Sequence, residues 1–221
     1  MRRATRISRP GAMERPIDSG PRRSPAQSRS RNTVATILDA AARVFAKQGY
    51  AQGTTNRIAE RAGVSIGSLY EYFPSKDAIL VALAEAHIAE AKRVLRETAA
   101  ELARAPRDVE ATVRAIVKTT VTLHELAPAL HRVFFEQALR SPRIRSMATA
   151  VEQRSIAWWE RYLRTQREIA IRDPALAAAM VFQTIETMTH KVVIHGDGSI
   201  PMHRYVEEVV ALVVGYLRSP R

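Results

Sequence analysis

The sequence predicts an all-α protein, with an N-terminal three-helix unit followed by a larger C-terminal helical domain. Apolar residues recur at three- and four-residue spacing from residue 32 almost to the C-terminus. No stretch alternates between apolar and polar residues for long enough to indicate a strand, and no internal repeat indicates a solenoid. Prolines divide the pattern into segments of helical length.

Composition limits the class of protein. The 221 residues are 46% hydrophobic, enough for one sizeable core or for a small domain joined to a larger one. The chain has no cysteine, which excludes disulfides and thiolate metal sites. Its longest apolar runs fall far short of the roughly 20 residues that span a bilayer, and no apolar signal segment follows the start. We expect a cytoplasmic protein with no membrane partner.

Residues 1–30 are predicted to form a disordered, Arg-rich tail. Residues 1–31 hold nine arginines against Glu14 and Asp18, so this segment carries +7 of the net charge of +12. Its prolines, glycines and serines leave too little apolar surface to bury. The charge favours a polyanionic partner, either nucleic acid or an anionic membrane surface, although basic tails also serve solubility alone.

The N-terminal unit is predicted over residues 31–77. A first helix starts near residue 32 and ends at Gly49, a typical C-terminal cap. A second helix spans residues 54–62, with Thr54 or Thr55 as N-cap, and Ser65 caps a third that reaches about residue 73. Two short helices joined by a tight glycine-containing turn form a helix-turn-helix. Ser75 then caps a long fourth helix, which begins the second domain, residues 78–221.

The rest of the chain is predicted to be helical throughout. Breaks at Pro106, Pro128, Pro142, Pro174 and residues 196–201 separate helices of roughly 107–126, 128–140, 144–169, 174–195 and 203–218. A compact helical domain fits this pattern better than any extended array.

Residues 54–76, TTNRIAERAGVSIGSLYEYFPSK, resemble the DNA-binding segment of TetR-type regulators. With the first helix, the resemblance covers about 45 residues: a Thr-rich cap, an Ala-Gly-Val-Ser turn, a Leu-Tyr-x-Tyr-Phe helix and a Ser-Lys start to the next helix. It implies a homodimer that binds double-stranded DNA and responds to a small-molecule effector. The C-terminal two thirds resembles the family only in being helical and of suitable length.

Small and polar side chains at the start of a recognition helix are suited to reading base edges, while aromatic and basic ones nearby contact phosphates. The same residues have a structural alternative, because threonines and serines cap helices and tyrosines pack between them. The predicted DNA-binding residues are Thr54, Thr55, Asn56, Arg57, Ser65, Ile66, Gly67, Ser68, Tyr70, Tyr72 and Lys76.

A helix-turn-helix reads one half-site, so another part of the chain is expected to dimerise. The resemblance implies that the last two helices form a four-helix bundle between subunits. The residues predicted there are Leu176, Met180, Val206, Val209, Val210, Val213 and Leu217. The alternative is that these stripes belong to the core of one chain.

The resemblance also implies that the middle helices enclose an effector pocket. Apolar side chains with a few polar ones would line it. The candidates are His124, His131, Phe134, Phe135, Met147, Trp158 and Tyr162, all of which could instead be ordinary core.

No motif indicates a metal, a cofactor or catalysis. None of the six histidines forms an HExxH, and the break at Pro128 separates His124 from His131. There is no glycine-rich phosphate loop and no GxSxG motif. The resemblance implies a transcriptional regulator, a repressor at a near-palindromic operator, and we expect no enzymatic activity. The alternative is nonspecific nucleic-acid binding driven by the basic tail.

Overall fold

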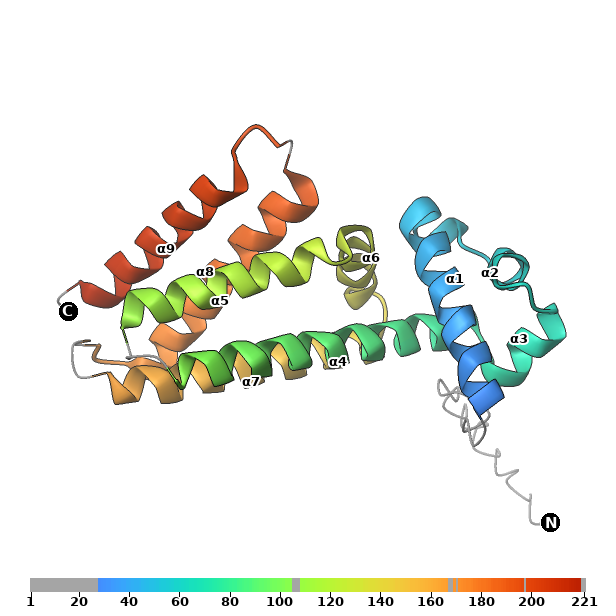
Figure 1. Ribbon diagram of the computed structural model, residues 1–221, viewed down its shortest axis with the longest axis horizontal. Coiled ribbons are helices and arrows are strands. Elements are labelled where there is room, and N and C mark those ends of the chain that lie inside the picture. Colours follow the sequence, from blue (N-terminus) through green and yellow to red (C-terminus); the bar gives the residue numbers. More distant parts are fainter. Residues whose placement is uncertain (1–27, 105–107, 167–168, 170, 197, 220–221) are drawn as a thin grey trace, which may run out of the picture.

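The computed structural model describes residues 28–104, 108–166, 169, 171–196 and 198–219. These residues form nine helices and no strand, which confirms the all-α prediction (Figure 1). Nearly all of the predicted tail, residues 1–27, lies outside the described residues. No helix of the described ranges is long and apolar enough to cross a membrane.

Three helices form the N-terminal unit: α1 (Ser28–Gln52), α2 (Thr55–Ala62) and α3 (Ile66–Tyr72). The regular helix of α1 breaks at Gly49, whose φ of 71° and ψ of 170° are not helical. That φ favours glycine, and the break stands where the sequence predicted the end of the first helix. The core of the unit is fully buried and consists of Ile37, Ala41, Phe45, Ile58, Leu69, Phe73 and Ile79.

The C-terminal part consists of α4 (Lys76–Leu102), α5 (Val109–Glu125), α6 (Pro128–Ala138), α7 (Pro142–Thr165), α8 (Pro174–His195) and α9 (Met202–Arg218). In Figure 1, α4 runs from the N-terminal unit along the whole bundle, close to α7. Helix α8 packs against α5 and α7, and α9 packs against α5.

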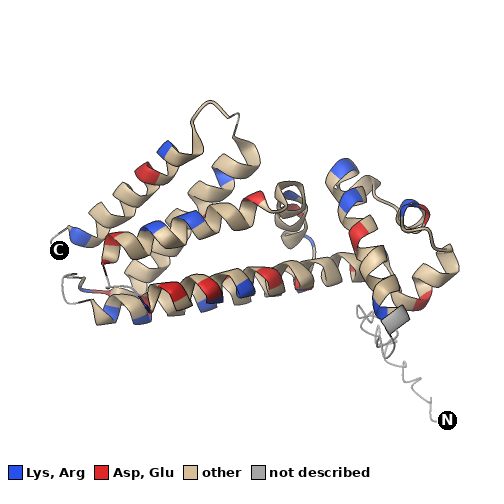
Figure 2. Cartoon of the chain, viewed as in Figure 1, with Lys and Arg blue, Asp and Glu red and all other residues tan. Residues whose placement is uncertain are grey.

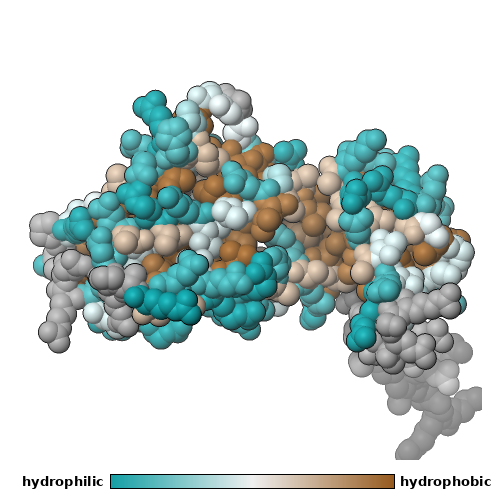
Figure 3. All heavy atoms as spheres, in the orientation of Figure 1, coloured by the Kyte–Doolittle hydropathy of each residue, from teal (hydrophilic) through white to brown (hydrophobic). Residues whose placement is uncertain are grey.

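Helix α6 joins the two parts. It contacts α1, α7 and α8, and in Figure 1 it stands between the bundle and α1. Its buried residues Leu130 and Val133 share the hydrophobic core of the N-terminal unit, as does Ile144 of α7. Figure 3 shows hydrophobic surface continuing across this junction. The first core therefore extends beyond the predicted boundary at residue 77.

The second core lies between α5, α7, α8 and α9. The five predicted interface residues of α9 belong to it and are buried within this chain: Val206, Val209, Val210, Val213 and Leu217. They pack in one cluster with Val109, Val113 and Val117 of α5. The prediction that this stripe meets a second copy is thus corrected, because helical spacing reveals a buried face without revealing which element buries it.

Candidate nucleic-acid interface

Helices α2 and α3 lie at the end of the molecule farthest from α9 (Figure 1). Their outward residues are largely exposed, including two large apolar side chains of α3, Ile66 at 39% and Tyr70 at 42%. Of the predicted DNA-binding residues, Thr54, Asn56, Arg57, Ser65, Ile66, Gly67 and Tyr70 are exposed, and Thr55, Ser68, Tyr72 and Lys76 are half-buried. We name the surface formed by Ser65–Ser68 and Tyr70 the α3 face.

Hydroxyl caps fix the starts of both helices. The Thr54 hydroxyl accepts a hydrogen bond from the backbone N–H of Arg57 at 3.3 Å. The Ser65 hydroxyl accepts one from the Ser68 N–H at 3.0 Å and also donates to the Ser68 hydroxyl at 3.0 Å. These bonds leave other N–H groups of the first turns free to meet a phosphate.

Gly67 is not required by the fold. Its φ is not positive, and among the described atoms an added Cβ would meet only Ser65 Oγ, at an ordinary distance of 3.7 Å. Gly53 differs, because a Cβ there would come within 2.6 Å of the Phe45 ring. Glycine costs helix stability relative to alanine, so its presence in the exposed first turn of α3 indicates close approach by another molecule.

A side-chain bridge holds α2 and α3 together on the outer surface. The hydroxyls of Thr55 and Tyr70 lie 3.0 Å apart, within hydrogen-bond distance. This contact orients the Tyr70 ring on the α3 face while leaving much of it exposed.

Two of the predicted contact residues, Arg57 and Tyr72, form hydrogen bonds that turn their side chains toward α1. Arg57 donates to the side chain of Gln48 at 2.6 Å and to the carbonyl of Gln52 at 3.1 Å, so its guanidinium is turned toward α1. The hydroxyl of Tyr72 accepts a 3.4 Å bond from Ser30, and its ring packs on the first core. Both side chains therefore support the unit, and neither belongs to the α3 face.

Lys76 joins the end of α1 to the start of α4. Its ammonium donates to the carbonyl of Tyr50 at 2.8 Å and lies 4.2 Å from the centre of the Tyr50 ring, a cation–π contact. The Tyr50 hydroxyl donates to Asp77, and burial together with this carboxylate raises the pKa of Tyr50. We name these three residues the Lys76 clasp; no motif in the sequence indicated it.

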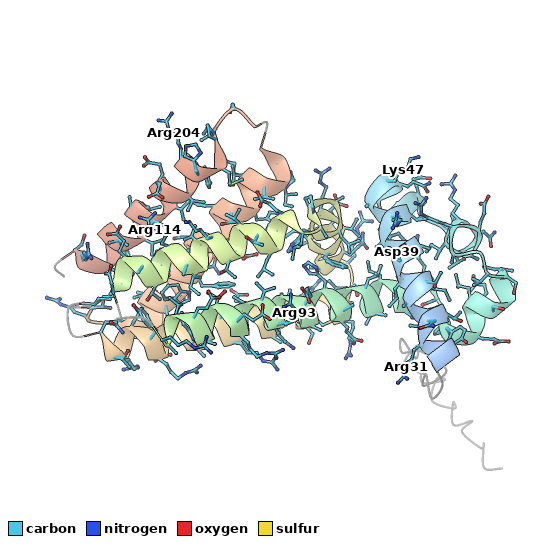
Figure 4. The ribbon with its side chains drawn as sticks, in the orientation of Figure 1. Arg31, Asp39, Lys47, Arg93, Arg114 and Arg204 are labelled. Carbon is cyan, nitrogen blue, oxygen red and sulfur yellow. The ribbon has the colours of Figure 1, made fainter. Side chains whose placement is uncertain are left out.

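Charged residues of both signs are spread over the N-terminal unit (Figure 2). Arg31 at the start of α1 and Lys47 near its end are exposed basic residues that flank Asp39 along the helix (Figure 4). Residues 28–77 carry seven basic and four acidic side chains, so the described part of the unit has a modest positive excess.

The predicted effector residues do not line one pocket. Trp158 and Tyr162 stack at 5.6 Å against the second core, whereas Phe134 and Met147 pack on the first core, and Phe135 is 61% exposed. Two hollows open on the described surface. One, of about 400 Å³, lies between α4 and α7 and includes Met147; the other, of about 300 Å³, lies between α5 and α9 and includes none of the predicted residues.

The remaining two predicted pocket residues, His124 and His131, are brought together. Their rings stack with centroids 4.4 Å apart although Pro128 separates them in sequence. His87 of α4 and His190 of α8 join them, so four helices contribute. Spacing along the chain alone does not reveal this cluster of four histidines. One signal was present: Glu186 and His190 are four residues apart and share a face of α8.

On α8, the predicted dimer residues are exposed. Leu176 is 58% and Met180 is 48% exposed, and Gln183, Thr187 and Lys191 continue the same exposed stripe. On α9, the outward face carries Leu212 beside the small residues Ala211 and Gly215. Small residues permit close approach of a second helix.

Both parts of the chain match known families. Residues 37–83 match the bacterial regulatory proteins of the tetR family, and residues 108–217 match the tetracyclin repressor-like C-terminal domain. A fatty acid metabolism regulator protein of Bacillus subtilis is 47% identical over 47 residues, which are 21% of this chain and 24% of the relative. An uncharacterized HTH-type transcriptional regulator of Mycobacterium tuberculosis is 32% identical over 171 residues, 67% of this chain and 81% of the relative.

This chain spans 24% of the length of that fatty acid metabolism regulator, and 38% and 58% of the length of two other curated relatives, both named as transcriptional regulators. Among solved structures, the fatty acid degradation regulator FadR from Bacillus halodurans superposes with a TM-score of 0.66 at 25% identity, over 84% of this chain and 96% of that one. A tetR-family regulator from Mesorhizobium loti gives 0.70 at 18% identity, over 86% and 98%, a likeness of fold alone. The chain therefore belongs to the TetR family of bacterial regulatory proteins.

Proposed function

We propose that this protein is a dimeric repressor, without enzymatic activity, that places the α3 face of each copy in the major groove of a near-palindromic operator. The observation that carries the proposal is the α3 face itself: a capped helix start with Gly67 and Ser68, flanked by exposed Ile66 and Tyr70. Ile66 is suited to a thymine methyl and Ser68 to a base edge or phosphate. Tyr70, held by Thr55, is suited to the backbone beside it.

The exposed stripe of α8 and the outer face of α9 support pairing of two copies. Leu176, Met180 and Leu212 are large apolar side chains that a single chain leaves in water. Covering them in a dimer removes this surface from solvent, as in other symmetric homodimers.

A small-molecule effector completes the proposal. The hollow between α4 and α7 combines the apolar Ile88 and Met147 with the basic Lys92, Arg96 and Arg154. One wall is α4, the helix that leads to the DNA-binding unit, so a ligand there acts on the DNA-bound state through its differential affinity for the two arrangements of α4.

Selection from a pool of random DNA duplexes tests the function, followed by fluorescence anisotropy with the selected and a scrambled duplex at two salt concentrations. We expect an inverted repeat with half-sites separated by about 10 base pairs or a multiple. Gly67→Ala should reduce affinity at least about tenfold, or 1.4 kcal/mol, while the thermal midpoint stays or rises. Leu139→Ala, at the exposed end of α6, is the control and should bind as the wild type does.

Equal affinity for the scrambled duplex, with both affinities collapsing as salt rises, would overturn the proposal. That result would assign binding to nonspecific electrostatic attraction. Unchanged binding by Gly67→Ala would remove the α3 face from the interface.

A further inference from the structure

Four of the six histidines of the chain meet at one place in the C-terminal part. His87 comes from α4, His124 from α5, His131 from α6 and His190 from α8. One ring nitrogen each of His124, His131 and His190 lies within 4.8 Å of the other two. We name these three residues the histidine triad. Neither the family matches nor the DNA-binding function accounts for it.

The ring of His124 is oriented as that of a metal ligand is. Nδ1 of His124 lies 2.9 Å from the carbonyl oxygen of Thr120, which can only accept, so Nδ1 carries the proton and Nε2 presents its lone pair. In metal-binding histidines, the ring nitrogen that does not bind the metal usually donates a hydrogen bond of this kind, which fixes the orientation of the ring.

The buried Nε2 of His190 has no hydrogen-bond partner among the described residues, and the buried Nε2 of His124 has only Glu186 beside it, with Oε1 3.3 Å away. Buried polar atoms are almost always satisfied, so the unsatisfied nitrogen of His190, on a ring next to His124, needs an explanation. A bound cation satisfies it.

A carboxylate completes the group. Oε1 of Glu186 lies 3.3 Å from Nε2 of His124, on the same helix face as His190. Two ligands of one tetrahedral zinc ion lie about 3.4 Å apart, given metal–nitrogen bonds of about 2.0–2.1 Å. The three nitrogens of the triad, within 4.8 Å of one another, reach this spacing by side-chain adjustments on the order of 1 Å, and Glu186 lies next to the triad through its contact with His124.

We propose that His124, His131 and His190 bind a divalent transition-metal ion, with Glu186 as the fourth ligand. Three imidazoles and one carboxylate suit zinc best, and also cobalt or nickel. Magnesium and calcium require oxygen ligands and do not fit this group.

The electrostatics of the site agree with this assignment. Burial, aided by neighbouring histidines, lowers the pKa of His131 to about 3, and burial also lowers the pKa of His190. Both rings are therefore neutral at physiological pH, the form that binds metal. Burial opposes charge on His124 too, but Glu186 raises its pKa, so a metal ion competes with a proton for Nε2 of this ring.

His87 is a neighbour of the site and not a ligand. Its Nε2 lies 2.7 Å from Nε2 of His131, a hydrogen-bond distance and shorter than two ligands of one ion allow. The lone pair of His131 Nε2 serves either this bond or an ion. Binding through Nε2 consequently releases a contact between α6 and α4, the helix that leads to the α3 face.

Zinc binding by the full-length, tag-free protein tests the proposal, after chelator treatment and dialysis. Isothermal titration with zinc chloride should give one ion per chain, and cobalt should give the intense visible absorption of a tetrahedral site. His190→Ala should weaken zinc binding by about a hundredfold or more and abolish the cobalt bands. The matched control is His203→Ala, an exposed histidine on α9 outside the cluster, which should bind as the wild type does.

Glu186→Gln provides a second variant, half-buried and so tolerated by the fold, that should weaken zinc binding while leaving the far-UV circular dichroism unchanged. Zinc should also raise the thermal midpoint of the wild type and not that of His190→Ala, because an ion that binds only the native state stabilises it. Absence of stoichiometric zinc binding by the wild type would overturn the proposal. Equal affinity in the wild type and His190→Ala would overturn it as well. Neither result bears on binding to the operator.

Discussion

The N-terminal unit and the C-terminal bundle are both helical, but the contacts that shape them differ in their separation along the sequence. In the N-terminal unit, the caps Thr54 and Ser65 each accept a hydrogen bond from a backbone N–H three residues further along the chain. In the bundle, the α9 stripe packs against α5, about 95 residues away in sequence, and the histidine triad draws on three helices. Interactions between residues close in sequence therefore define the helix ends of the N-terminal unit, whereas contacts between residues far apart in sequence define the packing of the bundle.

The largest effect we predict comes from the buried stripe of α9. Leu217→Ala removes a side chain that is 0% exposed in the single chain, and it should reduce the free energy of unfolding by about 2–5 kcal/mol. Denaturant unfolding measures this, with the exposed Leu212→Ala as the control for the other face of the same helix. A loss below about 1 kcal/mol, together with weaker dimerisation, would place Leu217 at an interface between two copies and not in the core of one chain.

The next effect concerns the exposed stripe of α8. Met180→Glu puts a charge on the proposed dimer surface, and it should raise the dimer dissociation constant at least about tenfold because that charge must be desolvated on pairing. Sedimentation velocity over a concentration series measures the constant. Leu139→Glu makes the same change at another exposed apolar residue, at the end of α6, and should leave the dimer intact. The idea fails if the two variants behave alike.

A pair of cap substitutions compares the two regions directly. Ser65→Ala and Ser75→Ala each remove a hydroxyl that accepts a backbone N–H at about 3 Å, and each should cost about 1 kcal/mol of stability. Only Ser65 lies on the α3 face, so only Ser65→Ala should weaken operator binding by more than the loss of folded protein explains. Thermal unfolding and anisotropy, measured on the same samples, separate the two effects; equal DNA affinities would contradict the assignment.

The smallest effect is confined to alkaline pH. The pKa of Tyr50 is raised in the folded chain, so the folded state keeps a proton that the unfolded chain releases above about pH 10. The stability contributed by this tyrosine is fully present below that pH and is lost progressively above it, up to the raised pKa of the folded state. Unfolding curves between about pH 8 and 11 should therefore fall more steeply for the wild type than for Tyr50→Phe. Parallel curves would show that the Lys76 clasp does not depend on the hydroxyl.

Sequence reasoning predicted the helices well, because their ends are marked by residues with a local physical role. Gly49 stands where regular helix stops, and Ser65 caps α3 as expected. The same reasoning could not show which element, in the same chain or in a second copy, packs against each apolar helix face. Nothing local distinguishes Val210, buried against the chain's own α5, from Met180, left exposed on α8.

The candidate site shows the same limit. The exposed residues of α3 were predicted from one continuous segment, whereas the inward turn of Arg57 and Lys76 depends on carbonyls and amides of α1. The histidine triad was missed because folding brings together His124 and His190, 66 positions apart in the numbering, and only a three-dimensional arrangement shows it.

The Lys76 clasp makes the N-terminal unit and the start of α4 turn as one body. Helix α4 has 27 residues, and a rise of 1.5 Å per residue makes it about 40 Å long. It therefore works as a lever arm: a tilt of about 5° at its far end displaces the clasped end by about 3.5 Å. That displacement is close to the spacing of about 3.4 Å between successive base pairs. In the proposed dimer, a rotation of about 5° within the bundle is thus enough to move each α3 face by about one base-pair step along the major groove.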